Sequence, residues 1–313
     1  MFWMMLTLFY GVVKGLREIV KKKSLEKSTV MEVLFFYTLI GFVILLPDVG
    51  EVTFIKPNLL LWVAVKSFVI FIAWICGFRA IREIPVSLYG LLDLSRVLFA
   101  TLLGVVFIKE ILRPTQMIGL LLVAAGLMAL RFEGRFRAKR SRNAEAAADA
   151  PEITEEKDGT KAEEDGKEKK KGSRMWLFVV LSFLSAFLNA VSGTMDKVLT
   201  KDISPADLQF WYMLFLVLFY ALYMIISRTH MDWKKTLKNY WIWILSILFI
   251  LADRALFMAN QIPESKVTVM TLIKQSGCIV TILGGRLVFK EKGMVYKLFC
   301  ASVIIAGIMI GVL

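Results

Sequence analysis

The hydrophobic second half of this chain repeats its first half. At a constant offset of 181 residues, Ser95 matches Ser276 and Glu110 matches Glu291, with no gap between the two points. A duplicated block of apolar helices is typical of membrane proteins built from internal repeats, whose functional site lies where the repeats meet. The duplication therefore predicts two similar halves and directs the search for a site to their junction.

The composition predicts a membrane protein. Hydrophobic residues make up 58% of the 313 residues and the mean hydropathy is +0.66, whereas roughly half the residues of a soluble domain are apolar. The net charge of +13 would suggest a nucleic-acid partner in a soluble protein. Here Lys and Arg flank apolar runs, so membrane topology explains them and we expect no nucleic acid.

Residue types that carry most enzyme chemistry are scarce. The three cysteines lie inside apolar runs, and the single histidine, His230, lies in a polar stretch. The sequence contains no phosphate-binding glycine loop followed by Lys-Ser/Thr, no cluster with metal-ligand spacing and no plausible Ser-His-Asp arrangement. We therefore expect no enzyme activity, no disulfide, no metal and no cofactor.

Ten apolar runs approach the length of about 20 residues that a helix needs to cross a bilayer. Backbone groups in lipid must bond within their own segment, and most runs lack the alternation of a barrel strand, so we predict helices. The ten runs lie near 1–20, 31–47, 58–79, 84–107, 115–131, 175–196, 206–227, 239–260, 265–289 and 295–313.

A charged segment separates the fifth run from the sixth. Residues 131–174 hold 13 Lys/Arg and 11 Asp/Glu with almost no large apolar side chain, so this segment cannot bury enough surface to fold. We predict a disordered cytoplasmic linker over 132–174, between one five-helix half at 1–131 and another at 175–313. The alternative is an interaction tail.

Counting crossings gives the relation between the halves. Five predicted helices lie between Glu110 and Glu291, so these equivalent points lie on opposite sides of the membrane and the repeat is inverted. The odd-numbered loops carry 27 of the 39 Lys and Arg residues and the even-numbered loops carry 6. Because Lys and Arg concentrate on the cytoplasmic side, we expect the odd loops and the linker there, in a multi-pass protein of the plasma membrane.

The repeated unit resembles the EamA repeat of the drug/metabolite transporter superfamily. In that family a proline precedes a long helix that ends in an acidic residue, and a glycine-containing helix follows. The matching elements are Pro85 to Glu110 with Gly119 and Gly126, Pro263 to Glu291 with Gly307, the pair Asp196-Lys197, and Ile273-Lys274-Gln275-Ser276 ahead of Gly284-Gly285. The resemblance implies ten helices in two inverted five-helix repeats around a central cavity, lined by the third, fourth, eighth and ninth helices. It also implies transport of amino acids, nucleotide sugars, phosphorylated sugars or other metabolites.

Ionisable residues inside the predicted helices are the main candidates for a site. Each costs about 2.5–3.5 kcal/mol near the membrane centre on insertion scales, so each needs a partner or a function. Asp93 and Lys274 occupy equivalent positions at the offset of 181, near the centres of their helices. One interpretation is that Lys274 holds an anionic group of the cargo while Asp93 is its counter-charge or a proton carrier. The other is a buried ion pair that locks the halves together.

Local pairing offers simpler explanations for some charges. Arg96 lies three residues after Asp93, so the two can satisfy each other on one helix face. Asp253 shares a face with Asn260 seven residues later, which forms a polar stripe suited to a cavity wall. The candidate substrate-binding residues are Lys66, Tyr89, Asp93, Arg96, Asp253, Asn260, Thr271 and Lys274.

These features favour a secondary transporter that moves a small polar metabolite by alternating access. The excess of positive charge inside the predicted helices favours an anionic or zwitterionic cargo. A flippase for a lipid-linked phosphate is the alternative, followed by an ion channel or a membrane scaffold. Gly307 and Gly311 form a GxxxG pattern that favours packing within the chain, so we expect a monomer or a weak dimer.

Overall fold

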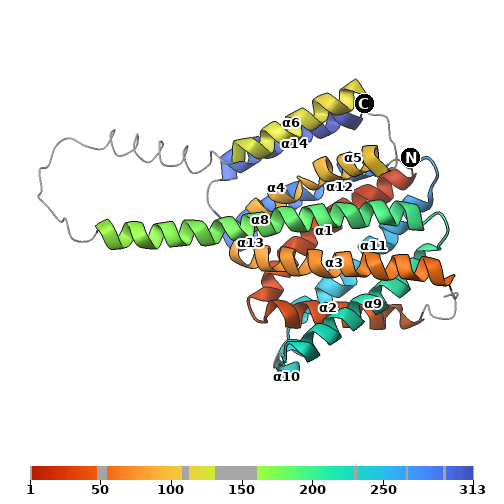
Figure 1. The fold of residues 1–313 in the computed structure, drawn as a ribbon. Helices are drawn as coiled ribbons and strands as arrows, with labels where there is room; N and C mark the ends of the chain where they lie inside the picture. The colour runs from red at the N-terminus through yellow and green to blue at the C-terminus, as the bar shows by residue number, and fades with distance from the viewer. Residues whose placement is uncertain are drawn as a thin grey trace, which may run out of the picture.

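The computed structural model describes residues 2–47, 55–107, 113–130, 161–228, 231–265, 267–291 and 294–312. His230, the Lys109-Glu110 pair and linker residues 132–160 lie outside these ranges, so the predictions made for them remain predictions. All regular elements in the described ranges are helices, arranged as one bundle (Figure 1). The helices are α1 (Phe2–Leu25), α2 (Val30–Leu45), α3 (Pro57–Glu83), α4 (Val86–Asp93), α5 (Arg96–Phe107), α6 (Pro114–Leu130), α8 (Lys161–Leu199), α9 (Pro205–Ile226), α10 (Trp233–Leu237), α11 (Tyr240–Gln261), α12 (Val267–Lys274), α13 (Gly277–Phe289) and α14 (Met294–Val312).

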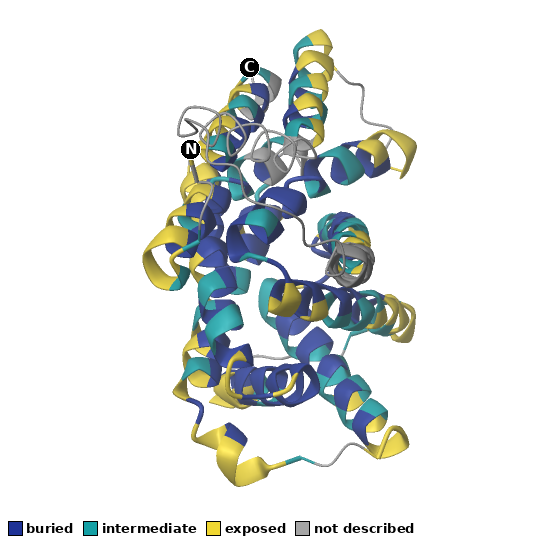
Figure 2. Cartoon of the chain, turned by 90° about the vertical axis from the view of Figure 1, so that its left-hand side faces the viewer, coloured by how far each residue is buried: buried dark blue, intermediate teal, exposed yellow. Residues whose placement is uncertain are grey.

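Within the described ranges, five helical segments are long and apolar enough to cross a membrane. They are Pro57–Glu83, Val86–Phe107, Met175–Leu199, Pro205–Ile226 and Tyr240–Gln261, and shorter apolar helices accompany them. Large apolar side chains lie exposed along the outer faces of the bundle, where water would be an unfavourable neighbour and lipid a favourable one (Figure 2). The chain is therefore a multi-pass integral membrane protein.

Two helices are broken at equivalent places. The segment 86–107 divides into α4 and α5 at Leu94-Ser95, and the segment 267–289 divides into α12 and α13 at Gln275-Ser276. The two breaks are 181 residues apart, which is the offset of the sequence duplication. The continuous helices predicted over these runs are therefore wrong at their centres, where Asp93 and Lys274 each end a half-helix.

The two halves of the chain are interlocked. From the first half, α1 packs mainly on α11 and also on α13 of the second half. From the second half, α8 packs mainly on α3 and also on α5 of the first half. The pair α6 and α14 lies side by side at one edge of the bundle, with Gly307 against the backbone of Gly119 (Figure 1). Each half therefore obtains much of its packing from the other.

Glycines allow α1 and α13 to touch through their backbones. A side chain on Gly277 would overlap the carbonyl oxygen of Gly11, and one on Gly15 would overlap the carbonyl oxygen of Gly277. Small residues at such crossings let helices approach closely in membranes. The close approach brings the next residues of α1, including Lys14, against the break between α12 and α13.

The helix α8 begins earlier than predicted. It starts at Lys161, so residues 161–174, expected to belong to the disordered linker, extend the apolar helix. This stretch is rich in Lys and Glu, which have high helix propensity. A charged sequence that cannot form a core can still continue a helix that the membrane segment has already nucleated.

The glycine contact predicts an asymmetric effect of alanine substitutions. Gly277→Ala should lower stability by about 1–3 kcal/mol because its methyl group overpacks a backbone contact. Gly193→Ala is the matched control, since a methyl group there meets no atom within 4 Å, and helix propensity favours it by up to about 1 kcal/mol. Thermal unfolding in detergent checks this, and an equal Tm for the two variants would contradict the close packing.

Candidate functional site

A central cavity lies between the two halves. Its walls come from α1, α3, α4, α5, α8, α11 and α12, so both broken helices contribute to it. The space open to the centres of water-sized spheres is about 100 Å³. Aromatic side chains and a dense group of charged ones share the walls, which is the mixture expected of a polar-ligand site in an apolar protein.

Charged groups in and beside this cavity carry an excess of positive charge. Six cations line it, and three carboxylates line it while a fourth, Asp93, lies directly behind. Their formal net charge is therefore +2. The cations are Lys14, Arg17, Lys21, Lys66, Arg96 and Lys274, and the carboxylates are Glu18, Asp93, Asp196 and Asp253.

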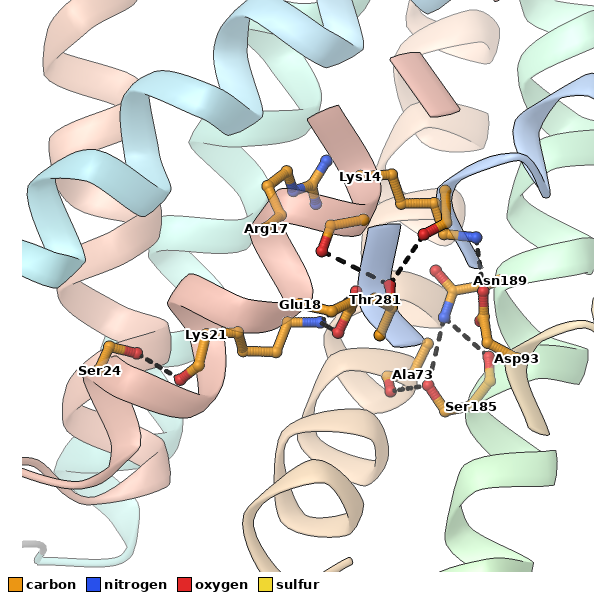
Figure 3. Close-up of polar contacts among 12 residues, drawn as sticks. Lys14, Arg17, Glu18, Lys21, Ser24, Ala73, Asp93, Ser185, Asn189 and Thr281 are labelled. Atoms are coloured by element: carbon orange, nitrogen blue, oxygen red, sulfur yellow. Dashed lines mark hydrogen bonds and ion pairs between the residues drawn. The ribbon is translucent and has the colours of Figure 1, made fainter. Parts of the chain in front are cut away.

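Lys14 joins the two helix breaks. Its ammonium lies 2.5 Å from Oδ2 of Asp93, the last residue of α4, and 3.5 Å from Oε1 of Gln275, in the break before α13. Arg96 donates from Nη2 to the other oxygen of Asp93 at 2.8 Å. Asp93 is 8% exposed and thus balances two cations inside the bundle. Figure 3 shows Lys14 beside Asp93.

Two further lysines have carboxylate partners. Lys21 donates to both oxygens of Glu18, at 2.8 and 2.6 Å, within one turn of α1 (Figure 3). Lys66, which is 1% exposed, lies 2.7 Å from Oδ1 of Asp196, and its ammonium lies 3.9 Å from the centre of the Tyr212 ring. The ion pair and the ring together compensate a charge buried in the middle of α3.

Arg17 and Asp253 form the third interhelical pair. Nη1 of Arg17 lies 3.5 Å from Oδ1 of Asp253, whose other oxygen accepts a hydrogen bond of 2.6 Å from the Tyr212 hydroxyl. Nη2 of Arg17 donates to the Tyr37 hydroxyl at 3.3 Å, and the guanidinium lies over the Phe249 ring. This group fixes α1 against α11 on one side of the cavity.

Lys274 differs from the other cavity cations. With the residues that the structure describes, its ammonium makes no hydrogen bond and no ion pair. Its one close ring contact is with Tyr10, at 5.7 Å from the centroid, which is near the limit for a cation–π interaction. Lys274 therefore brings a charge to the cavity wall without an ion-paired carboxylate among the described residues.

The structure brings most of the predicted site residues together. Asp93 lies behind the cavity lining, and the side chain of Thr271 is outside the described part of the chain. The other six residues line the cavity: Lys66, Tyr89, Arg96, Asp253, Asn260 and Lys274.

One predicted pairing is corrected and another is confirmed. Asp93 is not the counter-charge of Lys274 in the structure, because Lys14 and Arg96 occupy both of its oxygens. The glycine contact brings α1 close enough for Lys14 to pair with Asp93. The local pairing of Asp93 with Arg96 is confirmed.

Sequence reasoning missed the contribution of α1. Tyr10, Lys14, Arg17 and Lys21 all line the cavity and recur at i, i+4, i+7 and i+11, the spacing of one helix face. Arg17 lies close to the basic run Lys21-Lys22-Lys23, and such a cluster is typical of a loop at the membrane surface. A polar stripe inside the first apolar run was the available signal. Asp196 was noted only as part of a family pattern.

The described residues include no group of three His, Cys, Asp or Glu side chains that could hold a metal ion. The cavity chemistry is instead that of ammonium, guanidinium, carboxylate, amide and hydroxyl groups. Such groups bind and orient a polar solute and balance its charge.

Comparison with known proteins points in the same direction. The sequence profile of the EamA-like transporter family matches residues 1–132, and no curated protein matches the chain. Among solved structures, 23 chains match. One of them, described only as "Crystal structure of protein", has 12% identity and a TM-score of 0.62, covering 97% of this chain and 98% of its own. At that identity the likeness shows the fold alone.

The profile match and the apolar helices together are consistent with a membrane transporter of the drug/metabolite type. The match over residues 1–132 agrees with the resemblance to the EamA repeat that the sequence shows.

The shared carboxylate of Asp93 predicts unequal effects of neutralising it and its partner. Asp93→Asn should destabilise the protein by about 3–5 kcal/mol, because two buried cations lose their carboxylate. Lys14→Met should cost much less, since Asp93 keeps Arg96. The double variant should lose less stability than the sum of the losses in the two single variants. Thermal unfolding of the four proteins in detergent measures this, and additive effects would exclude the coupling.

Proposed function

We propose that this protein is a secondary transporter for a small anionic or zwitterionic polar metabolite. The observation that carries the proposal is the cation Lys274, which faces the cavity without a carboxylate partner among the described residues. A buried charge in a membrane is costly unless it is balanced. A cargo carboxylate or phosphate that enters the cavity would supply the missing balance.

The proposal includes ten transmembrane helices in two inverted five-helix repeats. Supporting it, α4 and α12 each contain eight residues and end at equivalent positions. The contacts of α1 with α11 and α13 also match those of α8 with α3 and α5. Such exchange of equivalent helices fits a pseudo-two-fold axis that passes between the halves.

The cavity walls offer further groups for a polar cargo. Asn189 and Asn260 line the cavity from α8 and α11 and supply amide donors and acceptors. Tyr10, Trp74 and Phe78 line it with aromatic rings, against which an apolar part of the cargo can pack. The small volume favours a small metabolite, and the four carboxylates allow an ammonium group on the same cargo.

In the proposed mechanism, the cargo enters from one side, binds between the broken helices and leaves on the other side as the halves change their relative positions. The odd-numbered loops and the linker lie in the cytoplasm, and the protein resides in the plasma membrane. The concentration of Lys and Arg in the odd-numbered loops supports this orientation.

Thermal stabilisation by ligands tests the cargo class. A ligand that binds only the folded state raises Tm by mass action. The purified protein is heated with amino acids, hydroxy acids and sugar phosphates, and with their uncharged amide or alcohol analogues. We expect at least one anion or zwitterion to raise Tm while its uncharged analogue does not. Stabilisation by uncharged or cationic compounds alone would contradict the proposal.

One lysine variant and one arginine control test whether the anion binds at Lys274. Lys274→Gln should abolish the stabilisation by the anion and its uptake into proteoliposomes. Arg286→Gln is the matched control, because Arg286 is an exposed cation of α13 that does not line the cavity. Undiminished uptake by Lys274→Gln would exclude the cargo role. Accumulation of a soluble probe inside the vesicles also separates a transporter from a lipid flippase.

A further inference from the structure

The N-terminus of α4 is capped by a carboxylate from the other half of the chain. Pro85 occupies the N-cap position and supplies no side-chain acceptor. The carboxylate of Glu291 instead accepts the backbone N–H of Val86 at 2.6 Å and that of Ser87 at 3.2 Å, and it also accepts the Ser87 hydroxyl. The first N–H groups of a helix have no partner within the helix, so this carboxylate satisfies donors that the first half leaves open.

Two lysines complete this contact. Lys297 of α14 donates to the Ser87 hydroxyl oxygen at 2.6 Å and lies 3.7 Å from Glu291. Lys22, near the end of α1, donates to the carbonyl oxygen of Ile84 at 2.5 Å. The helix ends of α1, α4, α13 and α14 are thus held together by polar groups.

A related contact lies before the other half-helix, α12. Lys197, near the end of α8, donates to the carbonyl oxygen of Ser265 at 2.8 Å, to its hydroxyl at 2.6 Å and to the carbonyl oxygen of Asn260 at 3.1 Å. Ser265 precedes α12 as Ile84 precedes α4, and the two positions are 181 residues apart. The same kind of contact, a lysine on the carbonyl before a half-helix, therefore occurs once in each half.

We propose that these two contacts are the gates of the transport cycle. The first gate consists of Lys22, Ile84, Val86, Ser87, Glu291 and Lys297, and the second gate consists of Lys197, Asn260 and Ser265. The inference rests on the proposed function, because it assumes that the cavity opens to each side in turn. Opening the first gate frees the N-terminus of α4, and opening the second frees that of α12.

The geometry suits such a movement. The half-helices α4 and α12 carry the cavity residues Tyr89 and Lys274, and each ends at a break that can act as a hinge. The gate contacts are hydrogen bonds and ion pairs at helix ends, where water can replace them when they separate. Tightly packed apolar contacts would have no such replacement.

Chemical labelling of the cavity tests the gates without knowledge of the cargo. Gly193→Cys places a thiol on the cavity wall, where its Cβ meets no atom within 4 Å. A membrane-impermeant maleimide is added to one face of oriented vesicles, and the chain without this substitution gives the background from its three buried cysteines. The rate of labelling from each face reports which gate is open.

Each gate variant has a matched control at the same end of the bundle. Glu291→Ala removes the cap, and Glu83→Ala removes an exposed carboxylate at the end of α3, close to the first gate. Lys197→Met removes the lysine of the second gate, and Lys201→Met removes an exposed one nearby. Glu291→Gln keeps an acceptor oxygen without the charge, so it provides an intermediate that retains part of the cap.

We expect Glu291→Ala to raise labelling from the first-gate face about tenfold, and Lys197→Met to raise it from the second-gate face by a similar factor, as loss of a charged hydrogen bond implies. Glu291→Gln should lie between Glu291→Ala and the unsubstituted chain, and the controls should not change. Labelling rates that rise equally from both faces, or that match those of the controls, would overturn the proposal. If no anion raises the Tm of the unsubstituted chain, but the gate variants still change labelling from the expected faces, only the proposed cargo would be overturned.

Discussion

The carboxylate of Asp93, shared by Lys14 and Arg96, is the group on which the arrangement of the bundle depends. Both helix breaks lie inside the bundle, where a charged side chain or an open backbone group has little water to bind. Lys14 meets Asp93 at the end of α4 and Gln275 at the end of α12, and Arg96 supplies the second cation. One side chain of α1 thereby links the two places where the cavity wall is interrupted, and the glycines around it let the backbones come close enough.

Exchange of the first helices between the halves follows from the same contacts. Because α1 packs on α11 and α13 while α8 packs on α3 and α5, neither half encloses a cavity alone. The cavity is the space that the exchange leaves open, and its charges come from both halves. Three carboxylates pair with cations across helices, so their desolvation is compensated locally. Lys274 stands apart from this balance, which is why a ligand rather than the protein is expected to complete it.

The repetitive parts of this structure were predictable and its long-range pairings were not. The duplication and the apolar runs come from local composition, and the pairing of Asp93 with Arg96 follows from helical spacing over three residues. The breaks in the helices were missed because neither contains proline, and Leu94-Ser95 is an ordinary helical sequence. The partnership of Lys14 with Asp93 spans 79 residues and depends on how closely α1 approaches α13, which the sequence pattern does not contain.

The cap on α4 has a consequence for how this protein is made. Glu291 is synthesised 205 residues after Val86, and Gln275 follows Lys14 by 261. When the first half of the chain leaves the ribosome, the carboxylate that caps the first turn of α4 and one partner of Lys14 have not yet been synthesised. The first half is therefore synthesised before the groups that cap α4 and contact Lys14 of α1 exist. The contacts between the halves can therefore form only late, when the end of the chain supplies the cap of α4 and the second partner of Lys14.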